Sequence, residues 1–140
     1  MLFVLDASLA ASWVVADEQN EAAEALLDRV KAGSAGVPDL FWHEMRNILL
    51  KVEKRGRSAE GAAEAALLTL RQLPLTVAVN RGDDVILALA RAHQLTPYDS
   101  AYLDMAINLA LPLATADRRL AMGAHSAGAT VLGPYADPPP

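Results

Sequence analysis

Two neighbouring segments decide the fold: Thr96-Pro97-Tyr98-Asp99-Ser100-Ala101-Tyr102-Leu103-Asp104 and Leu111-Pro112-Leu113-Ala114-Thr115-Ala116-Asp117. Thr96 followed by a proline is a cap-and-turn signal that predicts a helix start, with Asp99 in the first helical turn. The helix is expected to end before Pro112, which cannot continue it. A short apolar strand then leads to Asp117. One acid therefore lies at a helix start and another at the carboxyl end of a strand, where ligands bind in open α/β sheets.

The rest of the chain alternates apolar runs with amphipathic segments. Strands are expected at 2–5, 36–38, 75–79, 113–116 and 129–132. Helices are expected at 8–15, 21–31, 39–55, 58–73, 82–94, 96–110 and 118–122. In this interpretation Asp6 or Ser8 caps the first helix, Asp39 caps the third and Ser58 starts the fourth. The alternation predicts an α/β fold, a three-layer α/β/α sandwich with a short, mainly parallel sheet of four or five strands. We expect one domain over 1–134 and a loose Pro-rich tail over 135–140.

Composition limits the kind of protein this can be. The chain has 140 residues, of which 53% are hydrophobic and 21% charged, as in ordinary globular domains. It has no cysteine, which excludes disulfides and thiolate zinc sites and fits a reducing cytoplasm. Its histidines, His43, His93 and His125, are too far apart in the sequence for a short-range ligand pair.

The apolar N-terminus resembles a signal peptide only superficially. It has no basic leader, and Asp6 interrupts its apolar run. No segment approaches the roughly 18 uninterrupted apolar residues of a membrane span, so no membrane partner is expected. The formal net charge of −5 argues against broad, non-specific adhesion to nucleic acid. A nucleic-acid substrate stays possible, because bound divalent cations would reverse the sign of the potential at an acidic site.

Four carboxylates fall at positions where the predicted fold could bring them together. Asp6 directly follows the first strand and Asp117 follows a late one, so parallel pairing puts both at one sheet edge. Asp99 starts a helix, and Glu44 lies on the otherwise largely apolar third helix. Each also has an ordinary explanation: Asp6 and Asp99 as helix caps, Glu44 as a surface residue.

A pocket with four carboxylates favours a metal ion. The carboxylates repel one another and would bind protons unless a cation neutralised them. Mg²⁺ needs only one or two carboxylates because it keeps much of its hydration shell. One or two such ions activate water and stabilise the attacking and leaving oxygens of an in-line displacement at phosphorus. The predicted chemistry is therefore hydrolysis of a phosphodiester.

The order of these motifs resembles that of PIN-domain ribonucleases, in particular the VapC-type toxins of bacterial toxin–antitoxin pairs. The segments that carry the resemblance are Val4-Leu5-Asp6-Ala7-Ser8, Glu44-Met45-Arg46-Asn47, Tyr98-Asp99-Ser100-Ala101-Tyr102 and Thr115-Ala116-Asp117-Arg118-Arg119-Leu120. Each motif is weak alone, but the four occur in the family's order over nearly the whole chain. Their combination is specific.

The resemblance implies an activity, a cofactor and partners. It implies a metal-dependent endoribonuclease, the toxin of its pair, in which metal-activated water attacks the RNA. The metal site it implies, for Mg²⁺ with Mn²⁺ able to substitute, consists of Asp6, Glu44, Asp99 and Asp117. It implies supporting roles beside the metal or the substrate for Ser8, Asn47 and Thr115. It further implies an antitoxin that inserts a basic side chain into the acidic pocket, and a homodimer formed through apolar faces of the N-terminal half.

Other polar residues near the motifs have less specific expectations. Arg118 and Arg119 directly follow the last acid, so at least one could contact a substrate phosphate, and Arg118 is our candidate. Tyr98 and Tyr102 could stack on bases, although packing is the favoured interpretation. Asp104 is about 140° round the helix from the first-turn acid, and we expect a solvent-facing acid or an ion-pair partner.

Two alternatives remain at this point. A receiver-type phosphoacceptor domain is also α/β, but it needs an Asp after a central strand and a Lys after a late one. Here Val79 is followed by Asn80-Arg81-Gly82, and the late strand leads to Asp117. A non-catalytic PIN-like module that only binds a partner usually lacks one or more of the acids, whereas this chain has all four.

Overall fold

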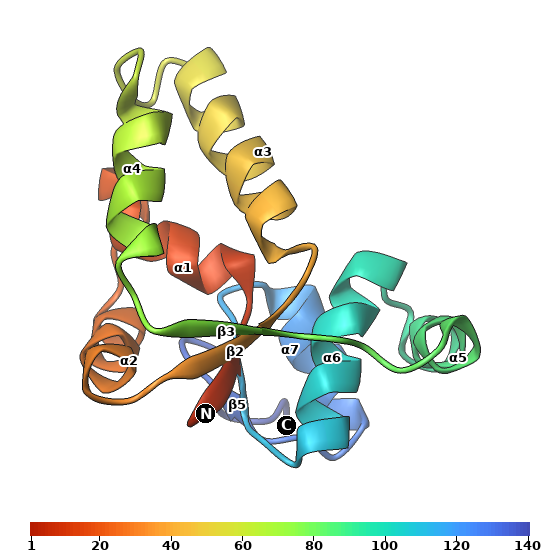
Figure 1. Ribbon diagram of the computed structural model, residues 1–140. Helices are drawn as coiled ribbons and strands as arrows, with labels where there is room; N and C mark the ends of the chain where they lie inside the picture. The colour runs from red at the N-terminus through yellow and green to blue at the C-terminus, as the bar shows by residue number, and fades with distance from the viewer.

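The computed structural model describes residues 1–140 as one α/β unit (Figure 1). The strands are β1 (Phe3–Leu5), β2 (Ala35–Pro38), β3 (Leu75–Ala78), β4 (Leu113–Ala114) and β5 (Val131–Leu132). The helices are α1 (Ala7–Val14), the 3-10 helix η1 (Ala16–Glu18), α2 (Glu21–Ala32), α3 (Phe41–Lys54), α4 (Ala62–Arg71), α5 (Asp83–His93), α6 (Pro97–Leu109) and α7 (Arg118–Ser126). The predicted alternation of strands and helices is confirmed.

The five strands form one parallel sheet in the order β3-β2-β1-β4-β5. The chain starts in the centre, moves outward to β3, and then returns to β4 on the other side of β1. The strand order therefore reverses between β1 and β4. In open α/β sheets such a switch point leaves a crevice at the carboxyl ends of the two strands.

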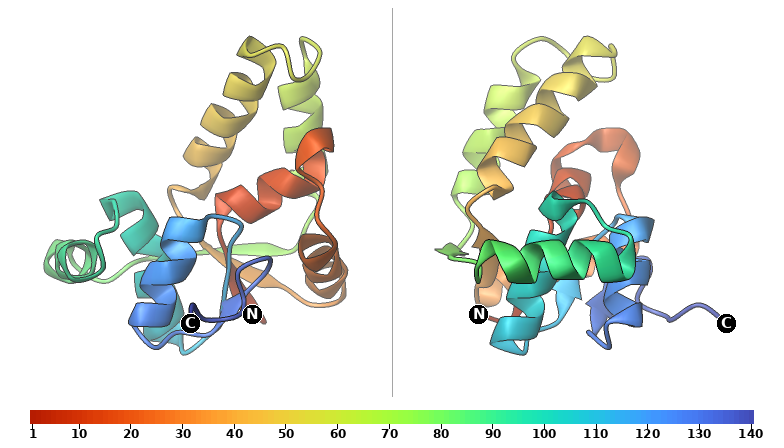
Figure 2. Two further views of the ribbon diagram at one scale, coloured as in Figure 1. Left: turned by 180° about the vertical axis from the view of Figure 1, so that it is seen from behind. Right: turned by 90° about the vertical axis from the view of Figure 1, so that its right-hand side faces the viewer.

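Helices cover the sheet in two groups. α1 contacts α2 and α3, and α3 contacts α4, whereas α5, α6 and α7 contact one another. Figure 1 shows the first group at the left and top, with α2 lowest, and the second group from the centre to the right, and Figure 2 shows that the α3–α4 hairpin projects beyond the sheet. α6 packs on β1, β2 and β4, and all three side chains of β1 are fully buried. A continuous apolar strand is what a sheet covered on both faces requires.

The predicted cap of α3 is wrong. Asp39 does not cap it; the N-cap position belongs to Leu40, whose backbone is already in the right-handed helical region and which makes no side-chain cap bond. The helix begins at Phe41 because residues 39 and 40 form the turn that leads out of β2.

The predicted start of α4 is also wrong. The helix begins at Ala62, not at Ser58, because Gly61 before it has a φ of +89°, outside the helical region. A carboxylate from another helix caps α4: Glu53 Oε1 accepts a hydrogen bond from the Ala63 backbone N–H at 2.7 Å. A cap supplied from a distant part of the chain leaves no local sequence signal.

Helix α7 is longer than predicted, reaching Ser126 instead of ending near Met122. The glycine inside it, Gly123, is a packing residue: a Cβ there would lie 2.9 Å from the side chain of Leu95. The helix therefore continues through a glycine that allows close approach between α7 and the start of the α5–α6 connection.

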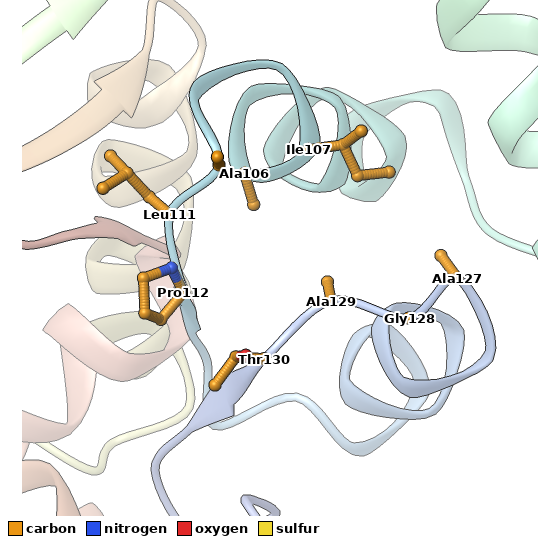
Figure 3. Close-up of a pocket in the computed structure, with 9 residues that line it drawn as sticks. Ala106, Ile107, Leu111, Pro112, Ala127, Gly128, Ala129 and Thr130 are labelled. Carbon is orange, nitrogen blue, oxygen red and sulfur yellow. The ribbon is translucent and has the colours of Figure 1, made fainter.

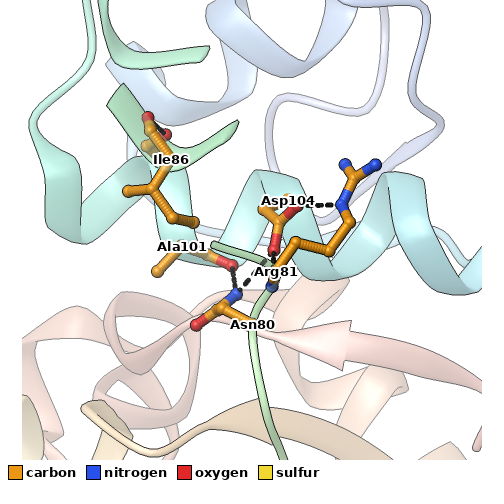
Figure 4. A network of polar contacts seen from close by, with 6 residues as sticks. Asn80, Arg81, Ile86, Ala101 and Asp104 are labelled. Carbon is orange, nitrogen blue, oxygen red and sulfur yellow. Dashed lines mark hydrogen bonds and ion pairs between the residues drawn. The ribbon is translucent and has the colours of Figure 1, made fainter. Parts of the chain in front are cut away.

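Asp104 is buried, not solvent-facing, so that part of its prediction is wrong, whereas the ion pair is confirmed (Figure 4). Arg81 Nε donates to Asp104 Oδ1 at 2.6 Å, and Asn80 Nδ2 donates both to Asp104 Oδ2 at 3.0 Å and to the Ala101 carbonyl at 2.7 Å. The loop after β3 thus covers this face of α6. The network ties the helix that carries Asp99 to the body of the fold.

No helix in the structure combines the length and the apolar character that crossing a membrane requires. The last residues run away from the rest of the chain in Figure 2. The division into a domain over 1–134 and a tail over 135–140 stays a prediction.

Candidate active site

The carboxyl ends of β1 and β4 lie side by side at the switch point. The register pairs Leu5 with Ala114, so the next residues, Asp6 and Thr115, are also neighbours. Thr115 Oγ1 donates a hydrogen bond to Asp6 Oδ2 at 2.7 Å, and Ser8 Oγ donates to the same oxygen. Asp6 stands at the N-cap of α1 but makes no side-chain cap bond. Its carboxylate is thus held by two hydroxyls instead of by the helix it precedes.

The two hydroxyls also shape the loop after β4. The Ala116 N–H donates to Ser8 Oγ at 3.1 Å, and the Asp117 N–H donates to Thr115 Oγ1 at 3.0 Å. β4 is shorter than predicted because these backbone groups bond to side chains and not to a neighbouring strand. The loop leads to Asp117, whose charge acts on Glu44 and Asp99.

Asp6 is only 4% exposed, and its environment disfavours ionisation. Burial raises the pKa of its carboxyl to about 7, although the hydrogen bonds from the two hydroxyls lower it. The negative charges of Glu44 and Asp99 raise it further. The structure thus holds a buried carboxyl group whose ionisation near neutral pH is unfavourable unless a cation stabilises its charge.

Glu44 enters the crevice from the first turn of α3. Tyr102, which is fully buried on α6, donates its hydroxyl hydrogen to Glu44 Oε1 at 2.6 Å. Burial raises the pKa of the Glu44 carboxyl, as do Asp99 and Asp117, while the tyrosine hydroxyl lowers it. Burial and the charges of Asp6 and Glu44 in turn raise the pKa of the Tyr102 phenol, so it stays a hydrogen-bond donor.

The remaining two acids lie at helix starts. Asp99 follows the cap residue Thr96, whose hydroxyl accepts from the Asp99 N–H at 3.1 Å. Burial raises the pKa of the Asp99 carboxyl, Asp117 adds to this, and Arg119 opposes it. Asp117 caps α7: its Oδ1 accepts from the backbone N–H groups of Arg119 at 2.8 Å and Leu120 at 3.2 Å. One oxygen of Asp117 is thereby fixed, and the other makes no hydrogen bond.

Electrostatic coupling links all four predicted acids. Asp6 is affected by Glu44 and Asp99, Glu44 by Asp99 and Asp117, and Asp99 by Asp117. They come from four separate elements of the chain. No three acidic or histidine side chains are gathered closely enough to form a complete metal site on their own. The donor set nonetheless suits Mg²⁺, which binds through one or two carboxylates and completes its octahedron with water or phosphate oxygens.

The other predicted site residues take different positions. Ser8 and Thr115 contact Asp6, as described above. Asn47 is exposed one turn after Glu44, and no hydrogen bond joins the two side chains; both line the same cavity. Arg118 is exposed, and it is the next residue, Arg119, whose charge acts on Asp99.

The sequence offered stacking on bases or packing as roles for Tyr102, with packing favoured, and neither predicted its contact with Glu44. Its expected packing is confirmed, but its hydroxyl also holds an acid of the cluster. The available signal was its spacing: Tyr102 lies three residues after Asp99, and residues at i and i+3 share a helix face.

A second pocket lies at the opposite end of the sheet and differs in character (Figure 3). It lies between the end of α6 and the connection from α7 to β5, and most of its lining is apolar. The nine residues are Ala106, Ile107, Ala110, Leu111, Pro112, Ala127, Gly128, Ala129 and Thr130. None of these side chains titrates, so the pocket offers no acid, base or metal ligand. In this it differs from the carboxyl end of the sheet, where the predicted acids lie.

Replacing Tyr102 with Phe tests the contact with Glu44. We expect the variant to fold but to lose about 1 kcal/mol of unfolding free energy, less than the roughly 1.5–3 kcal/mol of a hydrogen bond to a charged group, because Glu44 can turn to water. The pKa of Glu44 should rise further, since the hydroxyl that lowers it is gone. Urea unfolding and NMR titration of the glutamate measure both effects, with Tyr135→Phe as the exposed control. An unchanged Glu44 pKa would contradict the contact.

Comparison with known proteins identifies the family. The PIN domain matches residues 3–124. The chain is 34% identical over 124 residues to a protein of Pyrobaculum aerophilum named Ribonuclease VapC3, a match covering 86% of this chain and 93% of that protein. The crystal structure of PAE2754 from the same organism superposes with a TM-score of 0.68 at 24% identity, over 86% of this chain and 83% of that one, which supports the fold.

These matches confirm the resemblance seen in the sequence motifs and overturn the receiver-type alternative. The family match spans all the acids of the crevice, and the VapC relative is similar over nearly its full length. The chain therefore belongs to the PIN-domain family and, within it, to the VapC-type proteins.

Proposed function

We propose that this protein is a Mg²⁺-dependent endoribonuclease and the toxin of a toxin–antitoxin pair. The observation that carries the proposal is the coupled set of four carboxylates at the switch point, three of which have raised pKa values. Such a set is unfavourable without a bound cation. The name of the VapC relative supports RNA as the substrate.

In this proposal Asp6, Glu44, Asp99 and Asp117 hold the metal. When bound, Mg²⁺ would supply an activated water and positive charge for the attacking and leaving oxygens. The chain's own residues orient the acids: hydroxyls fix Asp6, the Tyr102 phenol fixes Glu44, and the backbone at the start of α7 fixes one oxygen of Asp117.

Arg119 is the residue we assign to the scissile phosphate, in place of Arg118. Its charge reaches Asp99, and its side chain is exposed at the start of α7. A guanidinium stays charged at all working pH values and can bind phosphate oxygens bidentately. With the carboxylates neutralised by metal, this arginine would draw the RNA backbone toward the acids.

The partners belong to the same proposal. An antitoxin would insert an arginine into the acidic crevice, because a planar, permanently charged group matches carboxylates that lack a cation of their own. We retain a homodimer through apolar faces of the N-terminal half, and a cytoplasmic location. Sedimentation at tens of micromolar tests the dimer separately from the activity.

Metal removal tests the proposed reaction. RNA should be cut with Mg²⁺ or Mn²⁺ and should stay intact in excess EDTA, because nothing else in the crevice neutralises the reacting oxygens. Gel analysis of structured RNAs should give a few discrete fragments. Full cleavage in EDTA would overturn the metal mechanism, and a uniform ladder on every RNA would argue against a selective toxin.

A further inference from the structure

A small cavity adjoins the acid cluster on its α3–α6 side. Five residues line it: Leu40, His43, Glu44, Asn47 and Tyr98. Its volume is about 280 Å³, just below the roughly 300–1,000 Å³ typical of pockets for drug-sized ligands. It shares Glu44 with the cluster, and Tyr98 directly precedes Asp99. Whatever occupies the cavity therefore lies next to the proposed reaction centre.

The lining suits a flat, uncharged ring. Tyr98 is 64% exposed, so its ring does not pack in the core and can stack on a ligand. Leu40 supplies an apolar wall and Asn47 an amide that can both donate and accept hydrogen bonds. None of the five lining residues is an arginine or a lysine, so the lining matches a base better than a phosphate. An unpaired nucleobase has the aromatic face and the polar edge that these side chains match.

A neighbouring pair completes the arrangement. Arg46 Nη1 lies 3.2 Å from His43 Nδ1 on the exposed surface of α3. This contact joins the imidazole that lines the cavity to a guanidinium about one turn further along the helix. A positive charge on the same helix suits an RNA strand whose base enters the cavity, because the strand carries a phosphate on each side of that base.

We propose that this cavity binds the base of one nucleotide next to the cleaved bond, with Tyr98 as the stacking residue and Asn47 at the base edge. The proposal rests on the proposed ribonuclease function and adds a source of sequence preference. Stacking of a base on an aromatic side chain changes affinity roughly tenfold to a hundredfold. An amide that can both donate and accept selects among bases by their edges.

Substrates that lack a single base test the cavity. An abasic site is placed in turn at each position around the bond that the wild type cuts, and kcat/KM is measured with Mg²⁺. At one position we expect the abasic site to lower the wild type's kcat/KM roughly tenfold or more. The same abasic site should not lower the kcat/KM of Tyr98→Ala any further, because that variant has already lost the stack. Tyr98→Phe should behave as the wild type, and Tyr135→Ala, a change at a half-exposed tyrosine on the tail, is the matched control. If each abasic site changes kcat/KM equally in Tyr98→Ala and in the wild type, at every position, the proposal is overturned.

A second measurement keeps this test separate from that of the activity. A short single-stranded RNA carrying 2-aminopurine reports stacking by fluorescence quenching, with or without hydrolysis. Quenching by the wild type and Tyr98→Phe, but not by Tyr98→Ala, supports the cavity even if no Mg²⁺-dependent cleavage occurs, in which case only the ribonuclease proposal fails. Equal quenching by all three proteins overturns the base site while leaving the ribonuclease proposal standing.

Discussion

Replacing Asp99 with Asn is expected to lower Mg²⁺-dependent RNA cleavage by roughly a hundredfold to a thousandfold while leaving the fold intact. The loss reflects one missing ligand charge, since a metal ion contributes several kcal/mol to the transition state and each 1.4 kcal/mol is tenfold. Asn keeps the shape of Asp, and the cap of α6 is the Thr96 hydroxyl, which this change leaves in place. Single-turnover cleavage of a labelled RNA measures the effect.

The matched control for this variant is Asp28→Asn on the exposed face of α2, outside the coupled set of acids. It makes the same chemical change outside the cluster, so its activity should equal that of the wild type. Comparable losses of cleavage activity in both variants would show that the activity depends on the net charge of the protein and not on the position of Asp99. Activity retained in Asp99→Asn would remove Asp99 from the metal site.

The same variant changes the response to Mg²⁺. A ligand that binds only the folded protein stabilises it by about 2.7 kcal/mol at a hundredfold excess over its dissociation constant. The wild type should show such a gain in thermal melts, and Asp99→Asn should show a smaller one. If Asp99 served only as a helix residue, neither activity nor the Mg²⁺ shift would change.

The sequence placed the acids well because their positions follow from topology. Asp6 ends a fully apolar run, and such a run predicts a buried parallel strand with its carboxyl end at the ligand-binding edge. Thr96 followed by proline predicted the start of α6 correctly, and the bond from the Asp99 N–H to the threonine hydroxyl is the cap expected there. Local signals sufficed wherever the chain itself completes the interaction.

Contacts between distant segments could not be predicted in the same way. The carboxylate that caps α4 comes from Glu53, the phenol that holds Glu44 comes from α6, and the partner of Asp104 comes from the loop after β3. Each needs the packed arrangement of two elements, which no periodicity specifies. The predicted cap at Asp39 was wrong for a related reason. A residue can cap a helix only where the backbone enters the first turn, and here that point is Leu40.

The metal-free protein should lose stability as pH rises from about 4 to about 8, by roughly 3–4 kcal/mol through Asp6 alone. Its pKa is raised from 3.8 to about 7 in the folded state, so the folded protein binds more protons than the unfolded chain across this window. Unfolding free energy falls with pH wherever the folded state binds the extra proton. The stabilising contribution is complete below the unfolded pKa and is gone above the folded one. Glu44 and Asp99, whose pKa values are also raised, act in the same direction.

Asp6→Asn isolates this effect, because Asn cannot ionise but keeps an oxygen for the Ser8 and Thr115 hydroxyls. The difference in unfolding free energy between variant and wild type, from urea titrations in metal-free buffer, should be small near pH 4 and favour the variant by a few kcal/mol near pH 8. Groups that titrate in both proteins contribute equally to both unfolding free energies, so their contributions cancel in this difference. A difference that does not vary with pH would mean that Asp6 ionises normally.

Asp17→Asn is a control of opposite sign. Asp17 pairs with Arg57, which lowers the pKa of its carboxyl, so its contribution to stability is present at neutral pH and is lost as pH falls. The unfolding free energy of the wild type should therefore rise relative to that of Asp17→Asn as pH rises, although weakly, because the pair is exposed.

Adding Mg²⁺ should reverse the pH trend seen with Asp6. A cation that stabilises the charged carboxylate makes the stabilisation of the wild type by Mg²⁺ grow over the same pH range. A metal site at Asp6 predicts both results: a metal-free wild type that is less stable than Asp6→Asn at high pH, and a stabilisation by Mg²⁺ that grows over the same range.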